Sequence, residues 1–164
     1  MAEKRNRYCA ISLFLLAFAA GLAIFVAVHH NEADDAVAVA AARGAISNRD
    51  NINLLARVIE GEAADEPFTG KVAVGAVILN RVGNSNFPNT LGGVVYQPLA
   101  FESVSNGQIW RKLTTESLRA AEYAFSGWDP TNGALFFWNP AKKVSAWIWS
   151  RKIVTQIGRH VFAF

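Results

Sequence analysis

The side chain best placed for chemistry in this sequence is that of Glu62, a carboxylate at a helical position where an apolar residue is expected. Leu55, Val58 and Ile59 recur at the spacing of one apolar helix face. At about 100° per residue from Leu55, Glu62 falls at about 340°, in the middle of that face, whereas Glu60 falls at about 140° and points away. A carboxyl group among apolar neighbours is hard to ionise and can hold a proton near neutral pH for donation to a leaving group. The pattern therefore predicts the general acid of a glycosidase.

An inward-pointing glutamate also has a purely structural explanation. Many such residues are hydrogen-bonded to the backbone or paired with a nearby arginine, and Arg57 and Arg81 are the candidates here. The surroundings of Glu62 favour catalysis, because Gly61 directly precedes it and Pro67 follows soon after. Both residue types interrupt helices, so we expect the acid near a helix end, where a cleft can open.

Other common catalytic and metal sites lack the residues that they need. From residue 51 onward the sequence holds one histidine, His160, whereas a hydrolytic zinc site needs three nitrogen or carboxylate ligands on converging elements. The sequence has no Gly-x-Ser-x-Gly elbow, phosphate-binding loop or dinucleotide fingerprint. We therefore expect no metal and no cofactor, and we expect His160 to be a packed or hydrogen-bonded residue.

The tryptophans lie close together in the second half of the sequence. They are Trp110, Trp128, Trp138, Trp147 and Trp149. Flat indole faces can stack on sugar rings while amide and hydroxyl groups bond the sugar hydroxyls. We expect Trp138 and one of Trp147 and Trp149 to pack in the core, and about two of the five to line a groove.

The helices that must position Glu62 can be placed from apolar periodicity and end signals. Residues 69–81 are apolar nearly all round, with Thr69 as a cap, which predicts a central buried helix. A loop over residues 83–89 leads to a short helix near residues 90–96. A further helix fits residues 114–126, with Gly127 as its stop.

Strand patterns follow the helices. Residues 135–138 and 153–157 are rich in aromatic and β-branched side chains, and Asn139-Pro140 ends the first of these segments. The chain has 164 residues, which is enough for one domain of ordinary size and a short appendage. Because helices come first and a small β element follows, the order predicts an α+β domain over residues 51–164.

The N-terminal segment has the pattern of a membrane anchor. Residues 8–28 carry no charge, and about 21 residues suffice to cross the hydrocarbon core. A cleaved signal peptide, which would release the domain, is the alternative, but the best cleavage site, Ala36-Val37-Ala38, lies well past the apolar run. Basic residues before the span and acidic residues after it predict that the domain lies outside the cytoplasm. We assign residues 1–30 to this anchor or signal segment and residues 31–50 to a linker.

Charge and cysteine content narrow the class of protein further. Cys9, the single cysteine, lies in the apolar run, so the domain that follows cannot form an internal disulfide. From residue 51 onward, 11 Lys and Arg stand against 8 Asp and Glu. This modest positive charge suits an anionic wall polymer and is too small to predict nucleic-acid binding.

Nearly all of residues 53–164 follows the pattern of a known family. The most specific parts are Gly61-Glu62-Ala63 and Ile78-Leu79-Asn80-Arg81. The pattern continues through Glu66-Pro67, Phe87-Pro88, Val95-Tyr96-Gln97, Asp129-Pro130-Thr131, Asn139-Pro140 and Ile157-Gly158. On these residues the sequence resembles the cell wall hydrolase family of the spore cortex-lytic enzymes.

The resemblance implies a lysozyme-like α+β fold, mainly helical with a small antiparallel β element, that acts on the glycan strands of peptidoglycan in the bacterial cell envelope. It implies Glu62 as the catalytic acid and base of a lytic transglycosylase, which protonates the glycosidic oxygen after N-acetylmuramic acid and then takes the proton of the sugar's own 6-hydroxyl. The substrate thus supplies the nucleophile, and a 1,6-anhydro ring forms. Resemblance and polarity together suggest the substrate-binding residues Glu66, Tyr96, Gln97, Phe101 and Asn139, with Glu66 one helical turn from Glu62.

Two other functions remain open from the residues. One is hydrolysis, either by an activated water that leaves reducing sugar ends or at an amide of the stem peptide. The other is a non-catalytic module that binds the wall, in which Glu62 is structural. The better-known cortex-lytic enzymes also carry a separate peptidoglycan-binding repeat, where this chain has the predicted span, so spore cortex and vegetative wall both remain candidate substrates.

Overall fold

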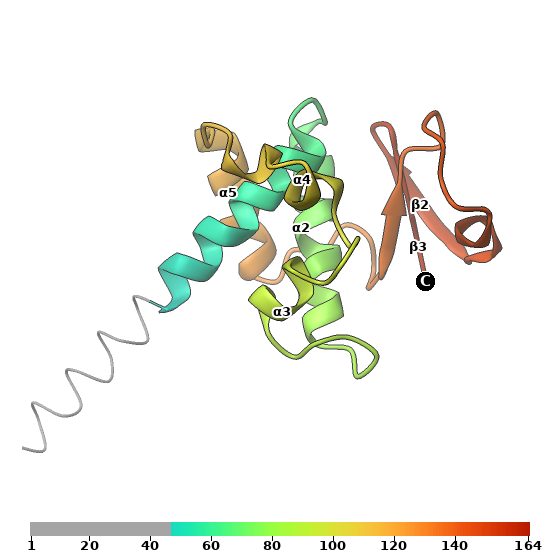
Figure 1. Ribbon diagram of the computed structural model, residues 1–164, viewed down its shortest axis with the longest axis horizontal. Coiled ribbons are helices and arrows are strands. Elements are labelled where there is room, and N and C mark those ends of the chain that lie inside the picture. The colour runs from blue at the N-terminus through green and yellow to red at the C-terminus, as the bar shows by residue number, and fades with distance from the viewer. Residues whose placement is uncertain (1–46) are drawn as a thin grey trace, which may run out of the picture. The chain divides into compact units, whose positions relative to one another are not determined.

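The computed structural model describes residues 47–164 (Figure 1). The predicted membrane span, residues 8–28, and most of the predicted linker lie outside the described residues. Residues 47–50, which we assigned to the end of the linker, already belong to the first helix, described over residues 47–63. Within residues 47–164, no helix is both long and apolar enough to cross a membrane.

Helices and a small sheet follow one another along the chain, as the sequence predicts. After the first helix come α2 (Phe68–Val82), α3 (Leu91–Val95), α4 (Glu102–Ser105), the 3₁₀ helix η1 (Gln108–Trp110) and α5 (Thr115–Phe125). The strands β1 (Phe136–Trp138), β2 (Ile153–Ile157) and β3 (His160–Ala163) follow, with the 3₁₀ helix η2 (Ala146–Ser150) between β1 and β2. The expected mainly helical fold with a small antiparallel sheet is confirmed.

Helix α2 is the central buried helix that its composition predicts. Residues 70–78 are all buried, and α2 packs against α5 where Gly75 lies in the helix interface. A Cβ atom built on Gly75 would lie 3.0 Å from Cδ1 of Ile59 and 3.1 Å from Cβ of Ala124. Our expectation of a Thr69 cap was wrong, because the helix begins one residue earlier, behind Pro67, and Thr69 falls inside its first turn. Proline suits that position because its missing N–H is not needed there.

Helix α5 begins and ends on the residues that the sequence marks. The hydroxyl of Thr114 accepts a hydrogen bond from the backbone N–H of Ser117, which satisfies a free N–H at the helix start. Gly127 follows the last turn with φ at +94°, a left-handed conformation that glycine adopts without steric cost.

The sheet has the order β1-β3-β2, with both pairs antiparallel. Phe137 of β1 lies opposite Phe162 of β3, and Gly158, with φ at +59°, turns the chain from β2 into β3. Strand β3 was not predicted from the sequence because all four of its residues are buried. A central strand of this kind shows no alternation of apolar and polar side chains.

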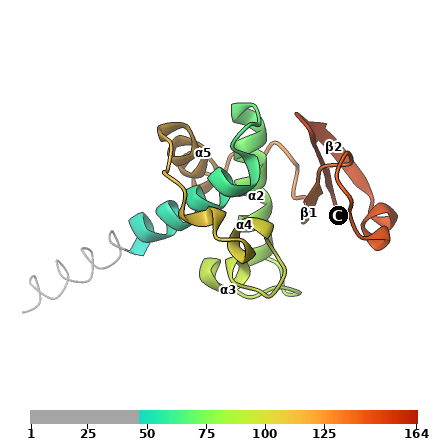
Figure 2. The ribbon, with the colours of Figure 1, turned by 45° about the horizontal axis from the view of Figure 1, so that its top comes forward.

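The sheet lies beside the helices and is nearest to α2 in Figures 1 and 2. Side chains at the end of α2 hold the chain that leads into β1. Arg81 Nε donates a 2.7 Å hydrogen bond to the carbonyl of Leu135, and Asn80 Nδ2 donates to Asp129 Oδ2 and to the carbonyl of Ala134. These bonds explain why Asn80 and Arg81 stand in the last turn of a largely apolar helix, since they fix the sheet to the helical part.

Candidate active site

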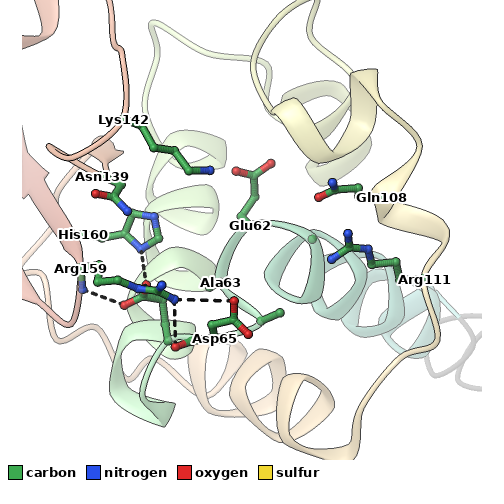
Figure 3. Close-up of a pocket in the computed structure, with 12 residues that line it drawn as sticks. Glu62, Ala63, Asp65, Gln108, Arg111, Asn139, Lys142, Arg159 and His160 are labelled. Atoms are coloured by element: carbon green, nitrogen blue, oxygen red, sulfur yellow. Dashed lines mark hydrogen bonds and ion pairs between the residues drawn. The ribbon is translucent and has the colours of Figure 1, made fainter.

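Glu62 lies in the last turn of the first helix, and the side chain faces a pocket of about 200 Å³ between that helix end and β3. The pocket is lined by residues 61–66, by Gln108 and Arg111 after α4, by Asn139 and Lys142 after β1, by Arg159 in the turn before β3, and by His160 at the start of β3. Figure 3 shows the Glu62 carboxyl group between Lys142 on one side and Gln108 on the other. The helix end near Glu62 that Gly61 and Pro67 predicted is therefore confirmed.

The position of the Glu62 carboxyl is fixed by a backbone group of α4. Glu62 Oε1 accepts a 2.9 Å hydrogen bond from the N–H of Ser103. This approach requires glycine at position 61, because a Cβ atom there would lie 2.4 Å from Cβ of Ser103. Gly61 lies inside the last turn of the helix, where it lets α4 come close enough to hold the neighbouring acid.

Glu66 holds the turn between β2 and β3 against the first helix end. Its side chain is 3% exposed, and both carboxylate oxygens accept hydrogen bonds from Arg159, Oε1 from Nε and Oε2 from the backbone N–H, each 2.9 Å long. Burial raises the pKa of Glu66, but the hydrogen bonds from Arg159 lower it by more, so the pKa lies below its ordinary value. Because the helix ends at residue 63, Glu66 is not one helical turn beyond Glu62, as we had expected.

The lowered pKa of Glu66 predicts a loss of stability in acid. A group whose pKa is lower in the folded chain stabilises the fold fully above its ordinary value of 4.5 and loses that contribution as the pH falls through the lower folded value. We expect the free energy of unfolding in urea to fall below about pH 4.5. Glu66→Gln should be less stable at pH 7, and its free energy of unfolding should decrease less than that of the wild type as the pH is lowered.

The control for this experiment is Glu122→Gln, at an exposed position of α5, which should keep the wild-type stability at pH 7. A Glu66→Gln variant with the same pH slope as the wild type would contradict the role of Glu66. Some acid sensitivity should remain in that variant because of Glu60. Burial raises the pKa of Glu60, and hydrogen bonds from Thr114 and Ser117 lower it by more.

Glu60 lies on the opposite helix face from Glu62, as the helical spacing predicts, but it is buried. Glu60 Oε2 accepts a 2.7 Å hydrogen bond from the hydroxyl of Ser117 and further bonds from the N–H and hydroxyl of Thr114. Glu60 therefore binds the start of α5 to the first helix. Its contacts are structural, in contrast to those of Glu62.

His160 packs between the pocket and the sheet. Its ring meets that of Phe137 edge to face, with the centroids 5.4 Å apart, and its Nδ1 lies 3.7 Å from Glu66 Oε1. Burial lowers the pKa of His160, and the negative charges of Glu66 and Glu62 oppose that shift without cancelling it. The expectation of a packed histidine is confirmed, and its place puts a neutral imidazole beside Glu66 at neutral pH.

Neither arginine that could have neutralised Glu62 forms an ion pair with it within the described chain. Arg57 stacks on the ring of Trp110, 5.4 Å from the centroid. Arg81 is buried among Phe87, Phe101 and Phe136, and its Nε donates a hydrogen bond to a backbone carbonyl. Burial lowers the pKa of Arg81 to about 10, and the charge of Glu62 opposes that shift. Arg81 and Glu62 therefore interact only at a distance.

The pocket gathers some of the residues that the sequence analysis proposed for substrate binding. Glu62, Glu66 and Asn139 line it together. Tyr96, at the end of α3, is 52% exposed and lies outside this lining, as does Gln97. Phe101 is 3% exposed and stacks on Phe137, so its ring belongs to the core.

The sequence analysis missed Gln108, Arg111, Lys142 and Arg159. Each lies in a loop or a short turn, without periodicity or a motif to mark it. A signal existed only for Arg159, which directly precedes His160 in a segment that matched the family pattern.

The tryptophans behave only partly as expected. Trp138 is 5% exposed and packs in the core, as predicted. The expectation that one of Trp147 and Trp149 is buried was wrong, because both are about half exposed on η2. No tryptophan belongs to the lining of the Glu62 pocket, which consists mostly of charged and amide side chains.

The family model described as cell wall hydrolase matches residues 65–163. This chain belongs to the cell wall hydrolase family, as the resemblance of its motifs implies. The sequence is 46% identical over 119 residues to the spore cortex-lytic enzyme of Bacillus subtilis, an alignment that covers 73% of this chain and 39% of that protein. The chain spans less than half the length of the curated spore cortex-lytic enzymes that it matches.

Solved structures agree with this assignment. The crystal structure of the catalytic domain of the Bacillus cereus SleB protein matches with a TM-score of 0.67 at 44% identity, covering 71% of this chain and 91% of that one. The catalytic domain of the germination-specific lytic transglycosylase SleB from Bacillus anthracis matches with the same TM-score and identity, covering 70% of this chain and 93% of that one. The similarity therefore extends over nearly the whole of a catalytic domain.

Proposed function

We propose that this protein cleaves the glycan strands of peptidoglycan after N-acetylmuramic acid by lytic transglycosylation, with Glu62 as the acid and base. Membership of the cell wall hydrolase family supports the substrate. The names of the relatives, spore cortex-lytic enzyme and germination-specific lytic transglycosylase, support the reaction and make spore cortex one of the two walls to test.

One observation carries the choice of mechanism: among the three carboxyl groups that line the pocket, Glu62 alone is not engaged by Arg159. Both oxygens of Glu66 accept hydrogen bonds from Arg159, and an oxygen of Asp65 lies 3.8 Å from the same guanidinium. Glu62 Oε2 has no hydrogen-bond partner in the described part of the chain. Glycosidases that use water need a pair of carboxyl groups, whereas a substrate that supplies its own nucleophile needs one.

The reaction follows from this single acid. Glu62 donates its proton to the glycosidic oxygen, the bond from that oxygen to C1 of N-acetylmuramic acid breaks, and the sugar acquires oxocarbenium character. The 6-hydroxyl oxygen of the same sugar then bonds to C1, and its proton passes to the Glu62 carboxylate. The acid is regenerated, and the products are a 1,6-anhydro end and a free 4-hydroxyl. The Ser103 N–H holds Glu62 Oε1 throughout, which leaves Oε2 to carry the proton.

Mass spectrometry of digested wall tests the proposal. The purified full-length chain is incubated in parallel with peptidoglycan from spore cortex and from vegetative cells, and the released muropeptides are analysed. We expect 1,6-anhydro ends, which are 18 mass units lighter than reducing ends because no water is added. Reducing ends would mean that water is the nucleophile, cleaved stem peptides would mean an amidase, and binding without products would mean a wall-binding module.

The location of the protein belongs to the same proposal. We propose that residues 8–28 anchor the chain in the bacterial membrane, with residues 51–164 outside the cytoplasm, because the run is apolar and its flanking charges favour that orientation. Retention of the full-length chain in membranes after washing at high salt and high pH, with release by detergent, would agree with an anchor. Recovery of a shortened chain in the medium would instead mean that the segment is cleaved.

A further inference from the structure

Two polar walls flank Glu62, and each consists of one amide and one cation three residues apart. Gln108 and Arg111 form the first wall, and Asn139 and Lys142 form the second (Figure 3). In both, a backbone hydrogen bond of 3.0 Å closes the turn, from Arg111 N to the carbonyl of Gln108 and from Lys142 N to the carbonyl of Asn139. A bond over this spacing places the two side chains on the same side, so each wall presents an amide and a cation together.

The amide groups of these walls are available to a ligand. Asn139 Oδ1 accepts a 2.9 Å hydrogen bond from Ala141 N, which fixes the side chain, whereas no acceptor within the described residues binds its Nδ2. The Gln108 side chain likewise has no partner within residues 47–164. Amides fixed or placed in this way suit the acetamido and hydroxyl groups of sugars.

The cations of these walls are also available, unlike Arg159. Arg159 already binds Glu66 and Asp65. Lys142 has one distant counter-ion, Glu102, at 4.0 Å, and both side chains are largely exposed, so that pair contributes little. The Arg111 side chain forms no ion pair with any residue that the structure describes. Arg111 and Lys142 thus leave positive charge in the pocket available to an anionic ligand.

We propose that Arg111 and Lys142 bind a carboxylate of the substrate beside the muramic acid residue, so that the enzyme selects anionic glycan. This inference rests on the proposed function. In peptidoglycan such a carboxylate has two sources: the stem peptide where it is present, and the lactyl group of muramic acid where the peptide has been removed. A guanidinium and an ammonium group can bind either carboxylate. Neutral chitin-type glycan carries no carboxylate.

Binding to the inactive Glu62→Gln chain separates these sources. Its full-length form is titrated by calorimetry with two peptidoglycan tetrasaccharides, the first with stem peptides and the second with the peptides removed. Each is also prepared with its carboxylates converted to methylamides. We expect the methylamide ligands to bind about tenfold or more weakly than their native counterparts at low salt, and we expect added salt to reduce this difference. Tighter binding of the first ligand than of the second would assign the stem peptide as the source, and the reverse would assign the lactyl group.

Substitutions in the walls test the residues themselves. In the Glu62→Gln chain, Arg111→Gln and Lys142→Gln should each weaken binding of the carboxylate ligands by about threefold to tenfold, and the double variant by more, without an effect on the methylamide ligands. Lys112→Gln and Lys143→Gln are matched controls, since these neighbouring cations do not line the pocket. Equal binding of native and methylamide ligands, or equal losses in the controls, would overturn the inference.

The two proposals fail in distinguishable ways. If the wild-type chain produces 1,6-anhydro ends but binds native and methylamide ligands equally, the proposed function stands and the inference is wrong. If the chain cleaves nothing but binds carboxylate ligands through Arg111 and Lys142, the pocket is an anionic glycan site without the proposed chemistry.

Discussion

Replacing Glu62 by glutamine should lower the rate of glycan cleavage by about a hundredfold to ten-thousandfold, which is the usual contribution of general acid–base catalysis. Glutamine has nearly the same shape but can neither give its proton to the glycosidic oxygen nor take one from the 6-hydroxyl. The same loss should therefore appear in kcat with every wall substrate. The measurement is the rate of release of 1,6-anhydro muropeptides from purified peptidoglycan.

The Glu62→Gln chain should fold normally, because the glutamine Oε1 can still accept the hydrogen bond from Ser103 N. Thermal unfolding of the variant should match that of the wild type, which separates loss of chemistry from loss of structure. Glu122→Gln removes a carboxylate from an exposed position of α5 and should keep full activity. If Glu62→Gln remains as active as this control, another group is the acid and the proposed function is wrong.

Gly61→Ala should lower activity by about tenfold to a hundredfold although it changes no group that reacts. The new Cβ would lie 2.4 Å from Cβ of Ser103 and 2.9 Å from its Oγ, so α4 must move away. That movement withdraws the Ser103 N–H from Glu62 Oε1 and lets the acid leave its place. Misplacement of a catalytic group by about 1 Å can cost a hundredfold in rate. Steady-state kinetics on solubilised glycan strands would measure the effect.

A second substitution should restore the activity. In Gly61→Ala with Ser103→Gly, the obstructing Cβ and Oγ atoms are absent, and the next contact of the alanine Cβ is 3.7 Å from Ile109 N. The backbone N–H that Glu62 needs is still present, and the removed Ser103 Oγ had no hydrogen-bond partner in the described chain. Gly92→Ala is the control, because nothing lies within 4 Å of the added methyl group. A fully active Gly61→Ala chain, or a double variant no better than Gly61→Ala alone, would contradict this account.

Residues that are fixed by local chemistry could be predicted from the sequence. The all-apolar run of α2 could only be a buried helix, and the capping hydroxyl of Thr114 and the left-handed Gly127 define the two ends of α5. The helical position of Glu62 and the nearby helix end were also visible, because rotation per residue and the effect of Gly61 and Pro67 are local properties.

Residues that depend on distant contacts could not be predicted. Phe101 is an aromatic residue of the kind that lines sugar-binding grooves, but its ring packs against Arg81 and Phe137. These partners are 20 and 36 positions away in the sequence. The assumption that Glu66 continues the helix of Glu62 was wrong because Arg159, in the turn before β3, binds Glu66 instead. The close contact between Gly61 and Ser103, which leaves no room for a Cβ atom on residue 61, could not be predicted from neighbouring residues either.

The sequence alone therefore determined the class of fold, the family and the helix position of Glu62, the acid that we propose to act, since helical periodicity, end signals and short motifs are written in consecutive residues. Only the tertiary structure decided which polar groups surround that acid. Gln108, Arg111, Asn139, Lys142 and His160 come from three separate segments, and the pocket that they share with Glu62 exists only after packing of the helices and closure of the sheet. The spacing of these residues along the chain does not show that they lie close together, because burial of the apolar core brings their segments into contact.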